Sequence, residues 1–341
     1  MKLDKMLFVV GNSRSGTTMM GRILGNHDDV FTFGELHFFG QLWSPASATE
    51  LNISDATELA AKLFCIQREG YRTHGGHQRF LEEARQFCQN ITGYPISPVV
   101  LFSEFLRFEA SLNGNSIPCD QTPRNVFYID KILEYYPQVK IINMIRDPRD
   151  VLLSQKRKWK RRFLGGTNLP IKESFRDWLN YHPVTISRIW HTAVTAADKF
   201  SDHDNVKSIY FEKLLAAPED TVSQICAFVG IDYCQSLLKV PQVGSSVNAD
   251  TPDSLGINPN RAGNWHDKNR NEGILNSSEL YISQKVNGLL MRKHNYEPAM
   301  MRPNIFYLIL NIVSFPIKSI GAFLFNINRI KNIRETLKRR L

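Results

Sequence analysis

The sequence predicts an α/β fold, a three-layer sandwich in which helices cover both faces of a central parallel sheet. The continuous apolar run at residues 7–10 has the composition of a strand that is buried on both faces, and residues 139–145 are predicted to form the next firm strand. Segments of helical composition follow each run, and strands that alternate with helices build parallel sheets. The 341 residues suffice for one such domain with insertions.

The predicted elements follow in order along the chain. The first unit is a strand, a glycine turn and a helix, at residues 7–10, 11–16 and 17–24. Residues 43–115 have helical patterns without a clear strand, which predicts a helical insertion. Further strands are expected at residues 30–33, 139–145 and 206–211, and residues 117–119 leave room for one more.

Composition argues against several classes of protein. The five cysteines form no C-x-x-C pair and their number is odd, which argues against a disulfide framework or a zinc site and favours a reducing compartment. The first apolar run is too short for a secretory signal. The net charge of +9 is uneven, since residues 302–341 contain eight basic residues and one acidic residue, a balance of +7. The remainder is close to neutral, so the charge does not predict nucleic-acid binding.

The turn at residues 11–16 has the spacing of a phosphate-binding loop. Four residues separate Gly11 from Gly16 between a strand and a helix, and such a turn presents backbone N–H groups to an anion. A nucleoside triphosphatase would have lysine after Gly16, whereas Thr17 and Thr18 stand here. The nearby cation is Arg14, inside the loop. A plain glycine turn and a P-loop kinase or NTPase are the alternatives.

A second motif lies at the end of the run at residues 139–145. Arg146 follows that strand and Ser154 comes eight residues later, so a guanidinium fork and a hydroxyl are available for a phosphate. Two alternatives stay open. Arg146 could pair with Asp147 or Asp150, or Asp147 could be the aspartate of a Walker B strand.

A third motif lies at residues 260–268, which contain Arg261, Gly263 and Trp265. A polar run with Pro and Gly precedes it, as expected of a loop, and a surface loop with a half-buried Trp is the alternative. Together the three motifs resemble those of sulfotransferases that use 3′-phosphoadenosine-5′-phosphosulfate (PAPS), especially tyrosylprotein, carbohydrate and bacterial enzymes. The resemblance covers about residues 5–297.

The resemblance implies a P-loop NTPase-like sheet, PAPS as donor and no required metal. It implies that Arg14 contacts the sulfuryl group or the bridging oxygen. The residues implied to cradle the 5′-phosphate are Ser15, Gly16, Thr17 and Thr18. Those implied to hold the 3′-phosphate are Arg146, Ser154 and Arg261, while Gly263 and Trp265 belong to a segment that folds over the nucleotide.

Sulfuryl transfer to a hydroxyl also needs a general base. Glu35 follows the second strand, where the carboxyl ends of parallel strands form active sites. The resemblance implies Glu35 as the base, with His37 as the second candidate and an ordinary loop carboxylate as the plain alternative. In one departure from the family pattern, Gln121 stands where lysine usually precedes Thr-Pro. The task of that lysine would then fall to Arg14 or Arg124.

Two basic regions remain. Residues 156–162 are interpreted as a solvated helix face, with a rim for an anionic acceptor or lipid head groups as the alternative. Residues 305–341 are apolar at first and basic later, which predicts an amphipathic helix on a membrane surface. A helix packed on the body and a membrane span are the alternatives, and the positive-inside rule disfavours the span.

These observations predict a PAPS-dependent sulfotransferase whose acceptor is a hydroxyl of a glycan or glycolipid. Residues 1–300 would form the catalytic domain, with the insertion at residues 43–115, and residues 301–341 would form a tail attached to the cytoplasmic face of a membrane. No nucleic acid is expected as a partner. Gln121 keeps a second class open, a non-catalytic, membrane-associated nucleotide-binding protein.

Overall fold

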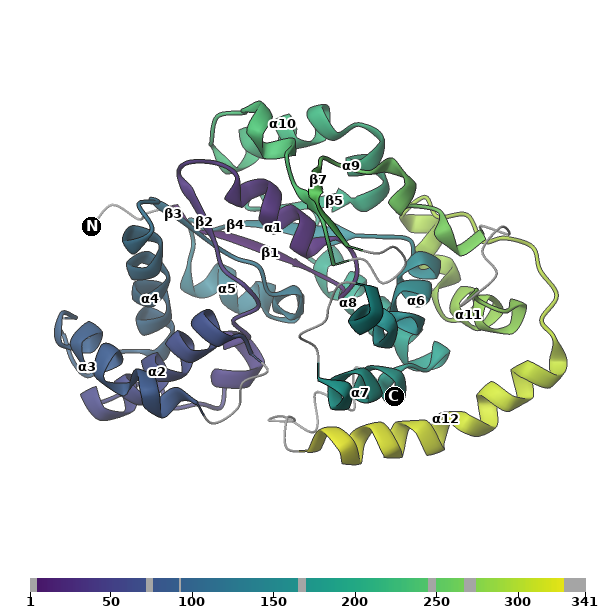
Figure 1. Cartoon of the computed structure of the whole chain (residues 1–341), viewed down its shortest axis with the longest axis horizontal. Coiled ribbons are helices and arrows are strands. Elements are labelled where there is room, and N and C mark those ends of the chain that lie inside the picture. The colour runs from purple at the N-terminus through teal and green to yellow at the C-terminus, as the bar shows by residue number, and fades with distance from the viewer. Residues whose placement is uncertain are drawn as a thin grey trace.

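A computed structural model of the chain describes residues 5–71, 76–91, 93–164, 170–244, 250–266 and 274–327. At its centre is a five-stranded sheet in which every neighbouring pair of strands is parallel (Figure 1). In spatial order the strands are β2 (Val30–Thr32), β3 (Ile117–Asp120), β1 (Leu7–Gly11), β4 (Lys140–Ile145) and β5 (Val206–Tyr210). The predicted α/β fold with a central parallel sheet is confirmed.

Alternate residues of β1 serve the two faces of the sheet. Leu7 and Val9 belong to one apolar core, whereas Phe8 and Val10 belong to the other. The first core is covered by α1 (Thr17–Gly25), α9 (Phe211–Ala216) and α10 (Pro218–Val229). The second is covered by α4 (Pro98–Leu112), α5 (Ile129–Tyr135) and α8 (Pro183–Asp198). Because both faces are covered, β1 is continuously apolar rather than alternating.

The further strand that the sequence allowed at residues 117–119 is present as β3. It lies between β2 and β1, and Pro118 pairs in register with Phe31 of β2. Proline is rare in a central strand because it lacks an N–H donor, so local sequence could not decide for this strand. The expected helices of the insertion also form, as α2 (Ile53–Glu69), α3 (Leu81–Gln89) and α4.

The remaining helices extend from the β4–β5 side of the sheet to the C-terminus. They are α6 (Pro148–Lys156), a 3₁₀ segment η4 (Lys158–Leu164), α7 (Ile171–Asn180), α11 (Ser277–Lys293) and α12 (Ile305–Asn326). Short elements between them are the hairpin β6 (Pro241–Gln242) and β7 (Thr251–Leu255), and the 3₁₀ turns η6 (Pro259–Arg261) and η7 (Asn264–His266). By length and composition, α12 would suffice to cross a membrane.

Candidate active site

The turn between β1 and α1 has the geometry of an anion-binding loop. Gly16 has a φ of 94° and is the N-cap of α1, so the first N–H groups of the helix, including those of Thr17 and Thr18, lack intrahelical partners. A Cβ atom at Gly16 would lie 2.3 Å from a ring carbon of Phe211, so only glycine fits here. At Gly11, where φ is 143°, a Cβ atom would lie 2.5 Å from the carbonyl oxygen of Met144. The two glycines of the motif are therefore required by the fold.

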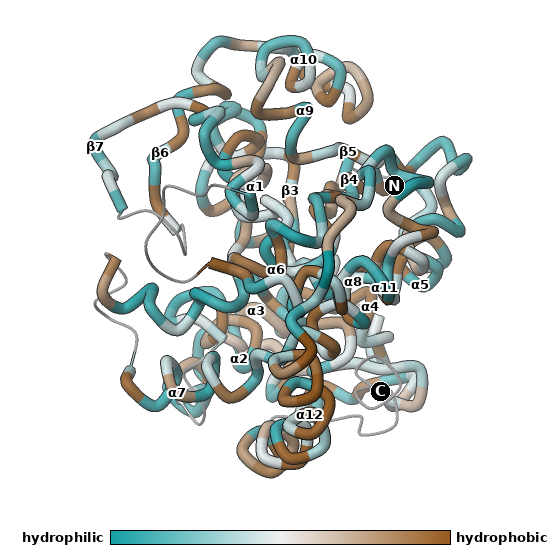
Figure 2. The backbone as a smooth tube through the Cα atoms, turned by 90° about the vertical axis from the view of Figure 1, so that its right-hand side faces the viewer, coloured by the Kyte–Doolittle hydropathy of each residue, from teal (hydrophilic) through white to brown (hydrophobic). Residues whose placement is uncertain are grey.

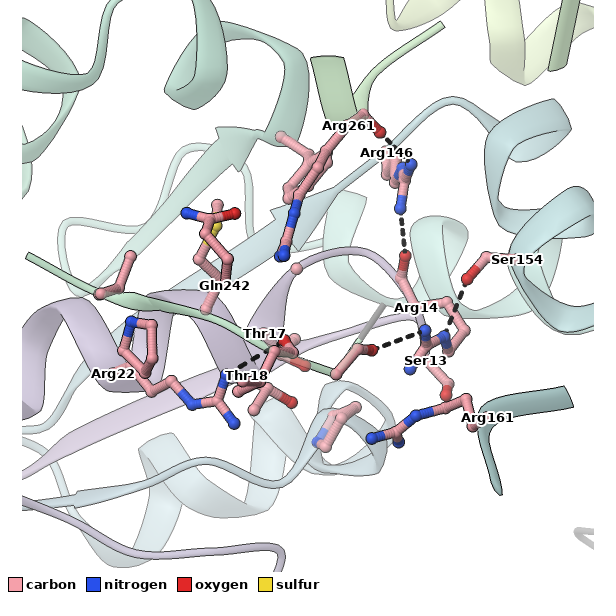
Figure 3. Close-up of a pocket in the computed structure, with 18 of the residues that line it drawn as sticks. Ser13, Arg14, Thr17, Thr18, Arg22, Arg146, Ser154, Arg161, Gln242 and Arg261 are labelled. Atoms are coloured by element: carbon pink, nitrogen blue, oxygen red, sulfur yellow. Dashed lines mark hydrogen bonds between the residues drawn. The ribbon is translucent and has the colours of Figure 1, made fainter. Parts of the chain in front are cut away.

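Arg14 lies within this loop and reaches the second motif. Its Nε donates to Ser154 Oγ at 2.9 Å, and its Nη2 donates to the carbonyl of Gly244 at 3.1 Å (Figure 3). Burial, followed by the positive charges of Arg161 and Arg146, lowers the pKa of Arg14 to about 10. Arg14 thus remains charged at neutral pH. Two residues that the sequence assigned to opposite ends of the donor are in direct contact here.

Arg146 connects all three motifs. Its Nη1 donates to the carbonyl of Arg14 at 3.2 Å, and its Nη2 donates to the carbonyl of Arg261 at 2.7 Å. The guanidinium lies over the ring of Phe211, with its carbon 4.5 Å from the centroid. The ion pair with Asp150 that the sequence allowed is also present, at 3.6 Å. Arg146 therefore both pairs with a carboxylate and faces the pocket.

Asp150 anchors the third motif. It accepts from the N–H groups of Gly263 at 2.7 Å and Trp265 at 3.0 Å, and burial raises the pKa of its carboxyl. The Trp265 ring is covered by the guanidinium of Arg149, 3.9 Å from the centroid. Gly263 and Trp265 thus shape the loop, while Arg261 lines the pocket. The end of this motif, residues 267–268, lies outside the described residues.

Four buried polar atoms in this region have no hydrogen-bond partner among the described residues, namely the acceptor Gln242 Oε1 and three donors. The donors are Ser15 Oγ, Arg146 Nε and Arg261 Nε. A buried donor without a partner is costly, so native structures usually satisfy such atoms with protein, water or ligand. All three belong to residues that the sequence implied for donor binding. A phosphate or sulfate ester would accept hydrogen bonds from them, so these residues fit the predicted donor.

Two arginines of the pocket were not predicted as site residues. Arg22 extends from α1, donates to the carbonyl of Val243 at 3.3 Å, and has its pKa lowered chiefly by burial. Arg161 extends from η4 and lies within the basic run at residues 156–162. The sequence interpretation of that run as a solvated helix face does not hold for Arg161. Arg161 lines the pocket instead, and the alternative of a basic rim for an anionic acceptor or lipid head groups stays a prediction.

The pocket is strongly positive. Glu35 is the one carboxylate among its described lining residues. The arginines that line it are Arg14, Arg22, Arg146, Arg161 and Arg261. Like charges held this close raise the free energy of the protein without a ligand, and an anion of several charges offsets their repulsion.

Glu35 lies in the loop after β2 and lines the same pocket. Its Oε2 is 3.1 Å from Nε2 of His37, and 47% of its side chain is exposed. His37 is buried, has a φ of 53°, and packs its ring against Tyr71 with centroids 4.1 Å apart. His37 is outside the lining of the pocket, so it is placed to orient Glu35 rather than to meet an acceptor.

The loop that carries Glu35 is held by the segment after β3. Thr122 Oγ1 accepts from the N–H groups of Leu36 at 3.1 Å and His37 at 3.4 Å, and it donates to Asp120 Oδ1 at 2.7 Å. Asn125 Nδ2 donates to the other oxygen of Asp120 at 2.9 Å. Burial raises the pKa of Asp120 to about 7. The sequence singled out the segment after β3 because of Gln121. In the structure its clearest role is to hold the loop that carries Glu35.

Gln121 itself is buried beside the phosphate loop. Its Nε2 is 3.5 Å from Thr17 Oγ1, so the side chain supplies a neutral contact where the family pattern has a cation. Arg124, the suggested substitute, is exposed and lies outside the lining of the pocket. Arg161 and Arg146 are the lining cations whose charges act on Arg14.

Asp147 does not occupy the position expected of a Walker B aspartate. It is the N-cap of α6, where its side chain accepts from the N–H of Arg149, and it binds the Arg149 guanidinium at 2.7 Å. Asp147 is not among the residues that line the pocket. No group of three or more potential metal-ligating side chains occurs within the part of the chain that the structure describes.

Comparison with known proteins agrees with this geometry. The sequence pattern of the sulfotransferase family matches residues 7–235, more than half of the chain. The chain belongs to the sulfotransferase family. The match extends from β1 past β5 and includes both the first and the second motif. The predicted membership of the PAPS-dependent sulfotransferases and the predicted enzyme class are thereby confirmed.

Individual relatives of this sulfotransferase are distant. It is 25% identical over 239 residues to a Caenorhabditis briggsae protein named "Putative protein-tyrosine sulfotransferase", covering 69% of each chain. It is 28% identical over 149 residues to an uncharacterized protein of Aquifex aeolicus, covering 43% of this chain and 16% of that protein. The sulfotransferase domain of the Synechococcus olefin synthase superposes with a TM-score of 0.49 at 16% identity, covering 84% of this chain and 94% of that domain.

Proposed function

We propose that this sulfotransferase moves a sulfuryl group from PAPS to the hydroxyl of an acceptor. The observation that carries the proposal is the arginine-lined pocket at the phosphate loop, where the buried donors Arg146 Nε and Arg261 Nε lack partners among the described residues, as does Ser15 Oγ in the adjoining loop. Three motifs that are far apart in the sequence converge on this pocket. A nucleotide with phosphate groups at two positions could accept hydrogen bonds from groups that are distributed over all three motifs.

Each motif is assigned one part of the donor. The backbone and side chains of Ser15, Gly16, Thr17 and Thr18 hold the 5′-phosphate at the N-terminus of α1. Arg146, Ser154 and Arg261 hold the 3′-phosphate, and the loop with Gly263 and Trp265 covers the nucleotide. The contact of Arg14 with Ser154 gives Arg14 access to both ends of the pocket.

The proposed chemistry is a direct displacement at sulfur. Glu35 takes the proton of the acceptor hydroxyl, whose oxygen forms a bond to sulfur. The bond between sulfur and the bridging oxygen breaks, and its electron pair stays on the 5′-phosphate of 3′,5′-adenosine bisphosphate. Arg14 and Arg161 stabilise the negative charge that develops there. This reaction needs no metal.

The proposed acceptor is a glycan or glycolipid hydroxyl, at the cytoplasmic face of a membrane. Support comes from the glutamate base and from the exposed apolar helix α12. The name of the Caenorhabditis briggsae relative makes a peptide tyrosine the second candidate. We also propose that residues 1–300 form the catalytic domain and residues 301–341 the tail.

The first experiment measures thermal stabilisation by 3′,5′-adenosine bisphosphate, in parallel with ATP and Mg²⁺. A ligand that binds only the folded state raises the melting temperature by mass action. We expect stabilisation by the bisphosphate, its loss in Arg146→Ala, and its retention in Arg124→Ala, which alters an arginine outside the pocket. Stabilisation by ATP and Mg²⁺ alone would instead favour a kinase. Bisphosphate binding without turnover of PAPS on any acceptor would favour the non-catalytic alternative.

A further inference from the structure

Helix α12 exposes its apolar side chains to the exterior. It runs along one edge of the molecule, beyond α7, and is mostly hydrophobic along its length (Figures 1 and 2). Only 6% of its most apolar stretch is buried. Six large side chains at helical spacing are between 56% and 70% exposed: Phe306, Ile309, Val313, Ile317, Ile320 and Leu324. Such a continuous exposed apolar stripe marks an interaction surface.

The polar groups of α12 face the protein instead. His182 Nε2 donates to the carbonyl of Asn311 at 3.0 Å, and Asn326 Nδ2 donates to Asn180 Oδ1 at 3.0 Å. Lys318 Nζ donates to the carbonyl of Tyr181 at 3.2 Å. These contacts are spread along the helix, so α12 is held lengthwise against the body. Its amphipathic pattern is inverted relative to a surface helix of a water-soluble protein.

The neighbouring helix α7 is inverted in the same way. Two of its four charged residues, Glu173 and Arg176, are buried and pair with each other, whereas Lys172 is exposed. Its apolar residues Ile171, Phe175 and Trp178, one face of the helix, are 73%, 48% and 46% exposed. Two adjacent helices that both turn their apolar face outward are not explained by chance exposure of single side chains.

The exposed faces of α7 and α12 are continuous. The ring of Phe175 contacts that of Phe325 on α12, with centroids 5.5 Å apart. Lys318 lies over the Trp178 ring, 4.5 Å from its centroid. We call this joint surface the α7–α12 face, defined by the exposed apolar residues of the two helices. Helix α7 also packs against η4, the segment that contributes Arg161 to the pocket.

Basic residues adjoin this face in η4 and follow α12 in the sequence. The segment η4 contains Lys158, Lys160, Arg161 and Arg162, and residues 328–341 contain six basic residues and one acidic residue in sequence. An apolar face bordered by cations complements a bilayer with anionic head groups. Tryptophan at such a border is also typical of membrane interfaces.

We infer that the α7–α12 face lies flat on the surface of an anionic lipid bilayer. Both helices insert their apolar side chains among the lipids, while the inward contacts of α12 stay intact. The bilayer then lies beside the pocket, because η4 connects the two. This geometry differs from a membrane span, which would pull α12 away from α7. The inference does not depend on the proposed acceptor or on sulfuryl transfer.

The test is flotation of the full chain with vesicles of phosphatidylcholine alone and of phosphatidylcholine mixed with phosphatidylserine. We expect binding chiefly to the mixed vesicles. The variant Ile309→Gln with Val313→Gln and Ile317→Gln should bind at least about tenfold less, because it removes apolar groups that enter the lipid. The matched control, Leu112→Gln with Leu255→Gln and Leu289→Gln, changes three exposed residues elsewhere and should bind like the native chain.

Two further outcomes would overturn the inference. In the first, the native chain binds neither kind of vesicle but forms a dimer, and the triple Gln variant of α12 is a monomer. The face then binds a second copy of the chain.

In the second, a bis-maleimide joins cysteines introduced by Trp178→Cys and Lys318→Cys, and this cross-link abolishes vesicle binding. Helix α12 must then leave α7 in order to bind, and it spans the bilayer. The flat geometry predicts equal binding before and after joining. Stabilisation by 3′,5′-adenosine bisphosphate, measured on each variant, reports folding independently.

Discussion

The two sides of the pocket that we propose for the sulfuryl donor and for the base, called here the donor side and the base side, are built differently. On the donor side, arginines from distant parts of the chain are held largely by uncharged acceptors, as when Arg14 binds Ser154 Oγ and the Gly244 carbonyl, while Arg146 also pairs with Asp150 at 3.6 Å. On the base side, Glu35 stands in a loop that a chain of hydrogen bonds through Thr122 and Asp120 holds in place. The donor side therefore concentrates positive charge, whereas the base side fixes the position of one carboxylate, Glu35.

This difference has a physical reason. A carbonyl or hydroxyl orients a guanidinium without cancelling its charge, so the donor side keeps a positive potential for an anion. A carboxylate that takes a proton needs instead a fixed geometry and access to the acceptor. The comparison predicts that changes on the two sides separate donor binding from turnover.

The largest expected effect is on the base side. Glu35→Gln keeps the shape of the side chain but removes its ability to accept a proton. We expect kcat to fall by about 10²- to 10⁴-fold, the range typical of general bases, while the Kd for 3′,5′-adenosine bisphosphate stays unchanged. Steady-state kinetics and calorimetry measure the two quantities. The control Glu134→Gln changes an exposed carboxylate outside the pocket. Native turnover in Glu35→Gln would remove Glu35 as the base.

A smaller effect is expected on the donor side from Arg161→Ala. A hydrogen bond to a charged group contributes about 1.5–3 kcal/mol, so donor affinity should fall by about 10- to 100-fold. Because Gln121 lies beside Thr17 where the family pattern has a cation, Gln121→Lys should restore part of the loss. The same titration compares Arg162→Ala, a neighbour outside the lining of the pocket. An equal loss in Arg162→Ala would mean that only the net charge of the segment matters.

Local motifs explain which part of the donor side could be predicted from the sequence. Residues 11–18 act as one contiguous loop, and Arg146 with Ser154 lies across a single strand-to-helix turn. Arg22 and Arg161 carry no such local signal. They reach the pocket because the fold brings α1 and η4 to it, and a cation on a helix surface has the same sequence pattern whether it faces solvent or a pocket.

The same limit applies to the C-terminal helices. The apolar stripe of α7 and the polar residues Asn311 and Lys318 of α12 are visible in the sequence, but periodicity does not say which face of a helix turns inward. Only the packing of Glu173 and Arg176 inward shows that α7 is inverted. The strand β3 was left open for a related reason, since its sheet position overrides the poor strand propensity of Pro118.

The smallest expected effect concerns pH and the base side. Burial raises the pKa of Asp120 to about 7 in the folded protein, from an ordinary value of 3.8. Between these values the folded state binds more protons than the unfolded state, so this group favours folding at low pH and loses that contribution as pH rises towards about 7. Asp120→Asn removes the titration, so the melting temperature of the native chain relative to this variant should fall over that interval. Asp130→Asn, at an exposed site, should show no such relative fall. A constant difference between native chain and Asp120→Asn across the interval would mean that Asp120 is already ionised in the fold, and that the Glu35 loop rests on a charged rather than a neutral support.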